Sequence, residues 1–307
     1  MKRWAILTAI IGLGIFALIL AQMRKANVPV GPRAMLNFVA DTARELARAP
    51  SAITPLSDEE EIKIGDEMAR QYEFRLGTGS EDKDNQVIQA YVQKVGVQVA
   101  ARAHRKLPYR FHYIPNRDFI NAFALPGGHV FIGGGLIALM KSEDELADIL
   151  GHEIEHIDLR HCADRAQLES GARKIPLGGL VVLPIEIFEA GYSKTQELEA
   201  DKQGTALAVW AGYSPLGTIR MFEAFDRLYQ EHVTHSKTPQ EELSRVAIQT
   251  IEGYFRSHPP TQELTEQIRQ MIADNHWENL TQMRKLEVSE MFRHESNKGA
   301  PKSPDGK

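Results

Sequence analysis

The chain has 307 residues, of which 43% are hydrophobic and 25% are charged, as in ordinary folded proteins rather than disordered, collagen-like or disulfide-stapled ones. Lys and Arg number 36 against 41 for Asp and Glu, a formal net charge of −5. Because there is no basic excess to neutralise a phosphate backbone, we expect no nucleic-acid partner. The single cysteine, Cys162, excludes an intramolecular disulfide and every multi-cysteine zinc or iron–sulfur site.

An uncharged apolar run of 18 residues, Trp4 to Ala21, lies near the N-terminus between basic residues. A helix of that length, at ~1.5 Å per residue, just crosses a hydrocarbon layer of roughly 30 Å. We therefore predict that residues 1–25 are a retained anchor that enters the membrane through residues 4–21. The alternative is a signal peptide cleaved near Ala21, although Ile19 and Ala21 form a poor cleavage pair.

Residues 26–56 are predicted to be a juxtamembrane linker. Within it, residues 35–47 have the apolar spacing of a short amphipathic helix, which could lie on the membrane or pack on the domain that follows. Ser57 and Glu60 form a capping box that opens a helix through about Tyr72. A second helix is predicted from about Gln86 to Arg105.

Three short strands are expected next. Residues 109–114 alternate between polar and apolar, and residues 121–125 and 129–132 flank Pro126-Gly127-Gly128, a hairpin-turn sequence. This is the only part of the chain with clear strand patterns. The sheet is therefore expected to be small.

The chain then returns to helix patterns. Ser142 with Glu145 predicts a helix reaching about His161, and Ser193 with Gln196 predicts another that ends at Gly212. Residues 175–188 are apolar but interrupted by Pro and Gly, which favours a buried connection or a substrate-facing flap over a second membrane span. Residues 259–293 look mostly helical, and residues 297–307 form a tail too polar to fold. We predict a mainly helical α+β domain over residues 57–296.

The segment His152-Glu153-Ile154-Glu155-His156 carries the strongest chemical signal, because it places His-Glu-x-x-His inside a predicted helix. Two histidines four residues apart project from nearly one helical face, so both imidazoles can reach one metal ion while Glu153 lies beside it. The alternative is a surface helix that is simply rich in Glu and His. Further ligands must decide between the two.

A zinc protease built on such a helix needs a third protein ligand and an open position for water. A third histidine six residues after His156 is excluded, because that position is Cys162. The remaining option is a carboxylate from a later helix. Glu197 would face the metal, and Asp201 could accept a hydrogen bond from a ligand imidazole. Acidic residues near the start of a helix are also favourable without any metal, so this pair is weak evidence by itself.

Several motifs in this order resemble metallopeptidase family forty-eight, the gluzincin zinc endopeptidases that include HtpX, the Oma-type proteases and the periplasmic BepA-type proteases. The motifs are residues 121–128 (NAFALPGG), Glu145-Leu146-Ala147, the His152–His156 segment, Glu197-x-x-Ala200-Asp201-x-x-Gly204 and Ser257-His258-Pro259. The resemblance covers about residues 57–270. It implies a zincin-like domain with a small sheet packed on the active-site helices, and a periplasmic catalytic domain, anchored or secreted.

Position by position, the resemblance implies one Zn²⁺ per chain held by His152, His156 and Glu197, with Glu153 as catalytic base and Asp201 behind a ligand. His258 matches a family loop that approaches the metal cleft, so it could be catalytic, stabilising the oxyanion, or could act as a latch. A His before Pro-Pro is also adequately explained as a turn residue. The sequence does not indicate the oligomeric state.

The expected substrates are polypeptides, bound extended against the strand at Asn121, Ala122 and Phe123. Such pairing reads little side-chain sequence, so an endopeptidase acting on unfolded or misassembled envelope proteins is predicted. The rival is a non-proteolytic chaperone or assembly factor with a structural zinc. Glu153 argues against that rival, because a structural site needs no base and normally fills its fourth position with protein.

Overall fold

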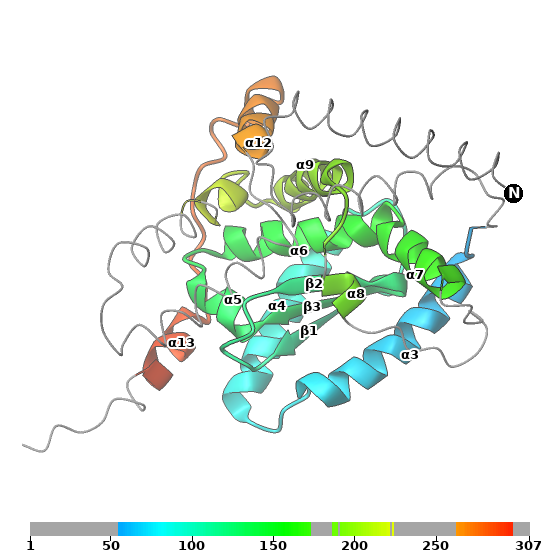
Figure 1. The fold of residues 1–307 in the computed structure, drawn as a ribbon. Helices are drawn as coiled ribbons and strands as arrows, with labels where there is room; N and C mark the ends of the chain where they lie inside the picture. Colours follow the sequence, from blue (N-terminus) through cyan, green and yellow to red (C-terminus); the bar gives the residue numbers. More distant parts are fainter. Residues whose placement is uncertain (1–54, 173–185, 190, 222, 224–261, 297–307) are drawn as a thin grey trace, which may run out of the picture. The chain divides into compact units, whose positions relative to one another are not determined.

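The computed structural model describes residues 55–172, 186–189, 191–221, 223 and 262–296. The predicted anchor, the helix at 35–47, His258 and the tail at 297–307 lie outside these residues. Within the described ranges, no helix combines the length and apolar character needed to span a membrane. The domain is mainly helical with one small sheet, as the coarse prediction stated (Figure 1).

The first two helices begin at side-chain caps. α3 (Asp58–Leu76) starts at the predicted box, in which the Ser57 hydroxyl accepts from the Glu60 amide and the Glu60 carboxylate accepts from the Ser57 amide. α3 runs one turn further than predicted, to Gly77 at φ 67°. α4 (Lys83–Ala100) starts earlier than predicted, because Asp82 accepts from the Asn85 amide.

The three predicted strands form one sheet in the order β1-β3-β2. β1 (Arg110–Ile114) pairs in parallel with β3 (His129–Gly133), and β2 (Ala122–Leu125) pairs antiparallel with β3. The predicted turn between β2 and β3 is a 3₁₀ segment, Pro126–Gly128, with Gly127 at φ 77°. The sheet therefore has β2 at one edge.

Both faces of the sheet are buried, and alternate residues serve two different clusters. Ala122, Ala124 and Val130 join the larger cluster, which includes residues of α4 and α6. Phe123 and Phe131 point the other way, into a cluster with residues of α3, α7 and α8, and their rings stack at 5.0 Å. The sheet therefore lies between two groups of helices.

Two helices follow β3: α5 (Gly134–Leu139) and α6 (Glu143–Asp158). The Ser142 hydroxyl accepts from the Glu145 amide as predicted, but the Glu145 carboxylate accepts from the Lys141 amide instead of closing the box. The prediction that this helix reaches His161 is wrong. Arg160 has φ 64°, a conformation that ends α6, and His161 is the first residue of α7 (His161–Ala172).

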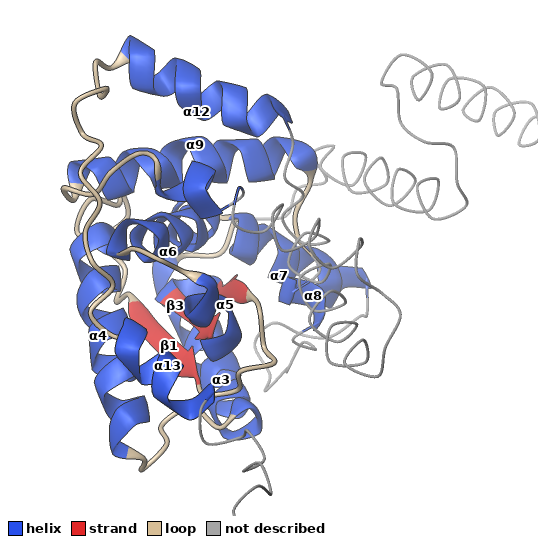
Figure 2. Ribbon diagram, turned by 90° about the vertical axis from the view of Figure 1, so that its left-hand side faces the viewer, coloured by secondary structure: helices blue, strands red, loops and turns tan. Residues whose placement is uncertain are grey.

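The later helices pack on the sheet, on α6 and on α9. α8 (Glu186–Glu189) contacts β2, and α9 (Lys194–Trp210) begins at the predicted Ser193 and Gln196 box and is followed by Gly212 at φ 93°. α9 packs on α6, and α12 (Gln262–Asp274) packs on α9 (Figure 2). The result is a layered arrangement of α12, α9, α6 and the sheet.

The prediction that residues 259–293 are mostly helical is only partly right. α12 and α13 (Ser289–Ser296) are helical, but residues 275–288 are not. Their backbone is held by the start of α6 instead: the Glu143 amide donates to the Arg284 carbonyl at 2.9 Å, and the Arg284 amide donates to Asp144 at 2.8 Å.

Candidate metal centre

The two histidines of the motif lie on the inner face of α6 and are almost completely buried, with His152 6% and His156 0% exposed. Their Nε2 atoms are 3.0 Å apart and their ring planes cross at 82°. Helical spacing of four residues produces this convergence. Both rings therefore direct the same nitrogen to one point.

α9 crosses α6 at very short range because each helix has a glycine at the crossing. A Cβ atom on Gly204 would lie 2.5 Å from the His152 backbone nitrogen, and one on Gly151 would lie 2.6 Å from the Gly204 carbonyl oxygen. Only glycine fits at such distances. This approach brings the first turns of α9, with Glu197 and Asp201, against the His152 side of α6.

Glu197 is 5% exposed and faces both imidazoles. One carboxylate oxygen lies 3.4 Å from His152 Nε2, and the other lies 3.8 Å from His156 Nε2 and accepts from the Tyr192 amide at 2.8 Å. The hydrogen bond from the Tyr192 amide holds the Glu197 side chain in this orientation, in the first turn of α9.

These three side chains fit a tetrahedral zinc site. With bonds of roughly 2.1 Å, neighbouring ligand atoms of a tetrahedral Zn²⁺ are ~3.4 Å apart, and the separations here are 3.0, 3.4 and 3.8 Å. One donor atom from each of His152, His156 and Glu197 lies within 4.8 Å of the other two. Two imidazoles and one carboxylate are also the donor set of catalytic zinc sites that keep one position for water.

Asp201 binds the far side of the His152 ring, with its carboxylate 2.7 Å from Nδ1. A proton on Nδ1 leaves the Nε2 lone pair directed at Glu197 and His156. Burial works to lower the pKa of His152, but the Asp201 and Glu197 carboxylates raise it well above its ordinary value. A proton therefore competes for this site when no metal is bound.

His156 has a similar partner in His161, to which the sequence analysis gave no role at the site. Nδ1 of His161 lies 2.9 Å from Nδ1 of His156, and His161 Nε2 lies 3.7 Å from a carboxylate oxygen of Glu199. The Tyr192 ring stacks on His156 at 4.0 Å. The break at Arg160 is what turns His161 back toward the motif, and no signal in the local sequence marks it.

The other predicted site residues are placed as follows. Glu153 follows His152 in α6 and is 1% exposed. Ala122 and Phe123 lie in β2, whose outer side is an edge of the described sheet, and the Asn121 side chain accepts from the Ala122 amide at 3.0 Å. His258 lies outside the described residues.

The register of β2 separates its backbone groups. Asn121 accepts from the Gly133 amide, so in an antiparallel pair Phe123 also faces β3 while Ala122 and Ala124 face the outer edge. The Ala124 carbonyl already accepts a contact from the Cys162 thiol at 3.6 Å. The Ala122 amide on this edge already donates to the Asn121 side chain, and Ala122 is 0% exposed. A substrate strand at Ala122 would therefore require the residues that cover β2 to move, and the Phe123 side chain is part of the core.

Comparison with known proteins follows this geometry. Residues 84–187 match Peptidase family M48. The predicted resemblance to this family is thus confirmed. The M48 match stops before Glu197, so the third donor is supported by geometry alone.

Three named relatives match part of this chain. The Beta-barrel assembly-enhancing protease of Escherichia coli K12 is 30% identical over 199 residues, which is 57% of this chain and 39% of that protein. A Vibrio cholerae relative, provisionally given the same name, is 34% identical over 176 residues, 50% of this chain and 35% of its own length. The Mitochondrial metalloendopeptidase OMA1 of Arabidopsis thaliana is 30% identical over 153 residues, 47% of this chain and 32% of that protein. The chain thus spans only about a third of the length of each of these relatives.

Proposed function

We propose that the chain is a zinc metalloendopeptidase, with His152, His156 and Glu197 as metal ligands. The observation that carries this proposal is the convergence of three buried donor atoms from two helices, all within 4.8 Å of one another. When bound, Zn²⁺ lowers the pKa of a water molecule toward ~7 and polarises a peptide carbonyl. Asp201 and His161 then hold the two imidazoles so that Nε2 remains the donor.

Glu153 is the proposed general base. It takes the proton of the attacking water and returns it to the leaving amine, so one carboxylate acts first as base and then as acid. Its position next to His152 in α6 and its burial support this role.

The replacement Glu153→Gln tests this assignment, because it keeps the size of the side chain but removes its basicity. We expect casein cleavage to fall by about 10²–10⁴-fold, with zinc content unchanged by metal analysis. Glu278→Gln, at an exposed position in the 275–288 segment, is the matched control and should cleave normally. Undiminished cleavage by Glu153→Gln would reject the assignment. Bound zinc without cleavage in wild type would favour the structural-zinc chaperone instead.

We further propose that substrates are unfolded or misassembled polypeptides of the bacterial envelope. A peptide that pairs with the outer edge of β2 at Ala122 would be held mainly through its backbone, so little sequence preference is expected. The names of the Escherichia coli and Arabidopsis relatives, a protease and a metalloendopeptidase, support polypeptides as the substrates. A peptide library that yields one sharp consensus would count against this substrate class.

We also propose that residues 4–21 hold the chain at the inner membrane, or are removed on secretion, with the catalytic domain in the periplasm. His258 would act over the metal cleft, as a latch if His258→Ala raises basal casein cleavage, and as an oxyanion stabiliser if the same replacement lowers it. Unchanged cleavage would leave His258 as the turn residue that its Pro-Pro context also fits.

A further inference from the structure

A second cluster of nitrogen and oxygen donors lies at the C-terminal end of α6, separate from the His152 site. It consists of His104, in the loop between α4 and β1, and of Glu155 and Asp158, in the last turn of α6. One donor atom from each lies within 4.8 Å of the other two. His104 Nδ1 and an Asp158 oxygen are 3.1 Å apart.

Glu155 is the unusual member of this cluster. It is 0% exposed, and among the described residues neither of its carboxylate oxygens has a hydrogen-bond partner. The Asp158 carboxylate lies close enough to repel its negative charge. Burying an unpaired carboxylate costs several kcal/mol in general terms, and either a proton or a bound cation removes that cost.

The backbone adds to the unfavourable charge. Glu155 and Asp158 both lie in the last turn of α6, where the helix dipole is negative and favours cations. Lys202 of α9 lines the same pocket, but it forms no ion pair with Glu155 in the structure. Asp158 accepts from the backbone amides of His104 and Arg105, whereas no described side chain forms a hydrogen bond with the Glu155 carboxylate.

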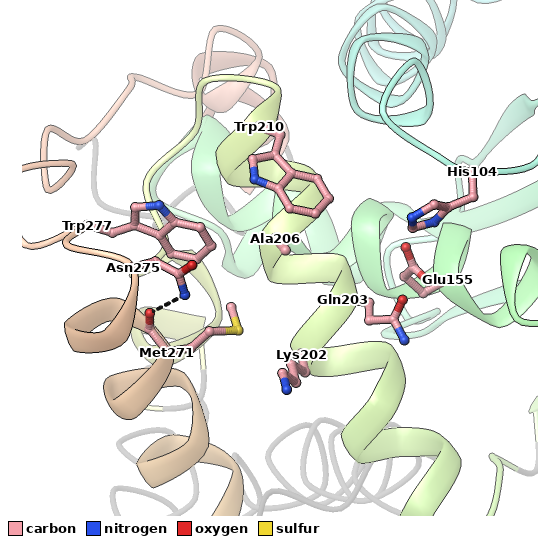
Figure 3. A pocket seen from close by; sticks show the side chains of 9 residues that line it. All are labelled: His104, Glu155, Lys202, Gln203, Ala206, Trp210, Met271, Asn275 and Trp277. Carbon is pink, nitrogen blue, oxygen red and sulfur yellow. Dashed lines mark hydrogen bonds between the residues drawn. The ribbon is translucent and has the colours of Figure 1, made fainter.

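Two members of the cluster, His104 and Glu155, line a pocket of about 220 Å³. Figure 3 shows them side by side at one wall, with Gln203 of α9 next to Glu155 and Trp277 at the opposite wall. His104 is exposed, so its ring can adjust without disturbing the core. The pocket gives space for water molecules beside these two donors.

We propose that His104, Glu155 and Asp158 form a second divalent-cation site, selective for zinc-class transition metals. One imidazole and two carboxylates are donors that Zn²⁺, Mn²⁺ and Co²⁺ accept, whereas Ca²⁺ and Mg²⁺ prefer oxygen donors alone. Water from the pocket completes the coordination. The cation ties the loop after α4 to the helix that carries His152 and His156, and this role does not depend on the proposed protease activity.

Zinc stoichiometry tests the site. Full-length protein in detergent, stripped with a chelator, is dialysed against buffered Zn²⁺ and its zinc content is measured. We expect two equivalents in wild type, and one in each of His104→Ala, Glu155→Gln and His156→Ala. The double variant His104→Ala/His156→Ala should hold none. His104 is exposed, so its replacement is not expected to unfold the chain, and circular dichroism verifies this.

Two further results distinguish the second site from the His152 site. One equivalent in wild type that His104→Ala retains and His156→Ala loses overturns the second site. One equivalent that His156→Ala retains and His104→Ala loses supports the second site and overturns the His152 site. Thermal unfolding of His156→Ala supplies an independent readout: Zn²⁺ should raise its melting temperature, Ca²⁺ should not, and His104→Ala should abolish the zinc effect. A zinc effect that survives His104→Ala overturns the second site.

Discussion

Each imidazole at the metal centre is held from behind by a different kind of partner. Asp201 fixes His152, and His161 fixes His156, both through Nδ1. Such outer partners set the tautomer and the ring orientation of a metal ligand. The residues behind the ligands therefore contribute to zinc affinity without touching the metal.

Replacement Asp201→Asn keeps the shape of the side chain but removes the charge that faces His152. We expect zinc affinity to fall by about 10–100-fold, measured by competition with a chromophoric chelator. Asp118→Asn, at an exposed loop position, is the control. Equal affinities in all three proteins would show that Asp201 does not orient His152.

The same contact predicts proton release on zinc binding. Because the pKa of His152 is raised well above its ordinary value in the metal-free site, the ring carries a proton near neutral pH that Zn²⁺ must displace. Calorimetric titrations at pH 7 in buffers of different ionisation enthalpy should therefore report at least about one proton released. In Asp201→Asn the release should be smaller. Zinc binding with no proton release would contradict this electrostatic description.

A second pair of histidines gives a pH effect on stability. His112 is half-buried and His129 is buried on the neighbouring strand. His112 Nε2 and His129 Nδ1 are 2.9 Å apart, and His112 stacks on Phe131. Glu73 lies 3.0 Å from His112 Nδ1, but burial, with help from His129 and Arg110, outweighs this contact and lowers the pKa of His112 to about 3. Between about pH 6.5 and pH 3, His112 therefore binds a proton in the unfolded chain but not in the folded protein.

Stability should fall as the pH decreases from about 6.5 toward 3, because the unfolded state binds more protons in that window. Between pH 7 and pH 5, His112 should account for ~2 kcal/mol of lost unfolding free energy. Urea denaturation of wild type and His112→Gln at both pH values measures this term. If the variant loses as much stability as wild type, His112 is not the group responsible.

At the scale of single elements, the sequence predicts what local contacts decide. Each capping box, at Ser57 and at Ser193, is formed by residues only three positions apart, and both begin helices where expected. The end of α6 could not be predicted in this way. Arg160 has positive φ, and its guanidinium donates to the Leu56 carbonyl and to Asp58, about a hundred residues earlier.

The crossing of α6 and α9 likewise depends on a long-range contact. Nothing in the sequence near Gly151 indicates that it faces Gly204, yet this pair sets the distance between the helices. The glycines let two backbones touch directly. The position of Glu197 relative to the histidines follows from that contact.

Replacement Gly204→Ala should force α9 away from α6, since the new Cβ would overlap the His152 backbone. We expect a loss of ~1–3 kcal/mol in unfolding free energy, as for other overpacked sites, together with weaker zinc binding. Urea denaturation and chelator competition measure the two effects. Lys202→Ala, at an exposed position of α9, is the control, and equal behaviour of both variants would contradict the packing argument.

At the scale of the whole molecule, the sequence predicts the metal-site residues better than their surroundings. His-Glu-x-x-His and Glu197-x-x-x-Asp201 are regular spacings on helices, so periodicity alone orients them. His161, Tyr192 and the Glu155 cluster carry no such pattern. Their roles follow only from the break between α6 and α7 at Arg160 and from the packing of α4, α6 and α9.

The central claim is that α6 and α9, which are distant in sequence, grip one zinc ion through His152, His156 and Glu197. Anomalous X-ray diffraction at the zinc edge from zinc-loaded crystals tests it most directly. The account predicts a zinc peak roughly 2.1 Å from both Nε2 atoms and from the Glu197 carboxylate. A zinc ion bound by the two histidines with Glu197 turned away, or no peak between them, would contradict it.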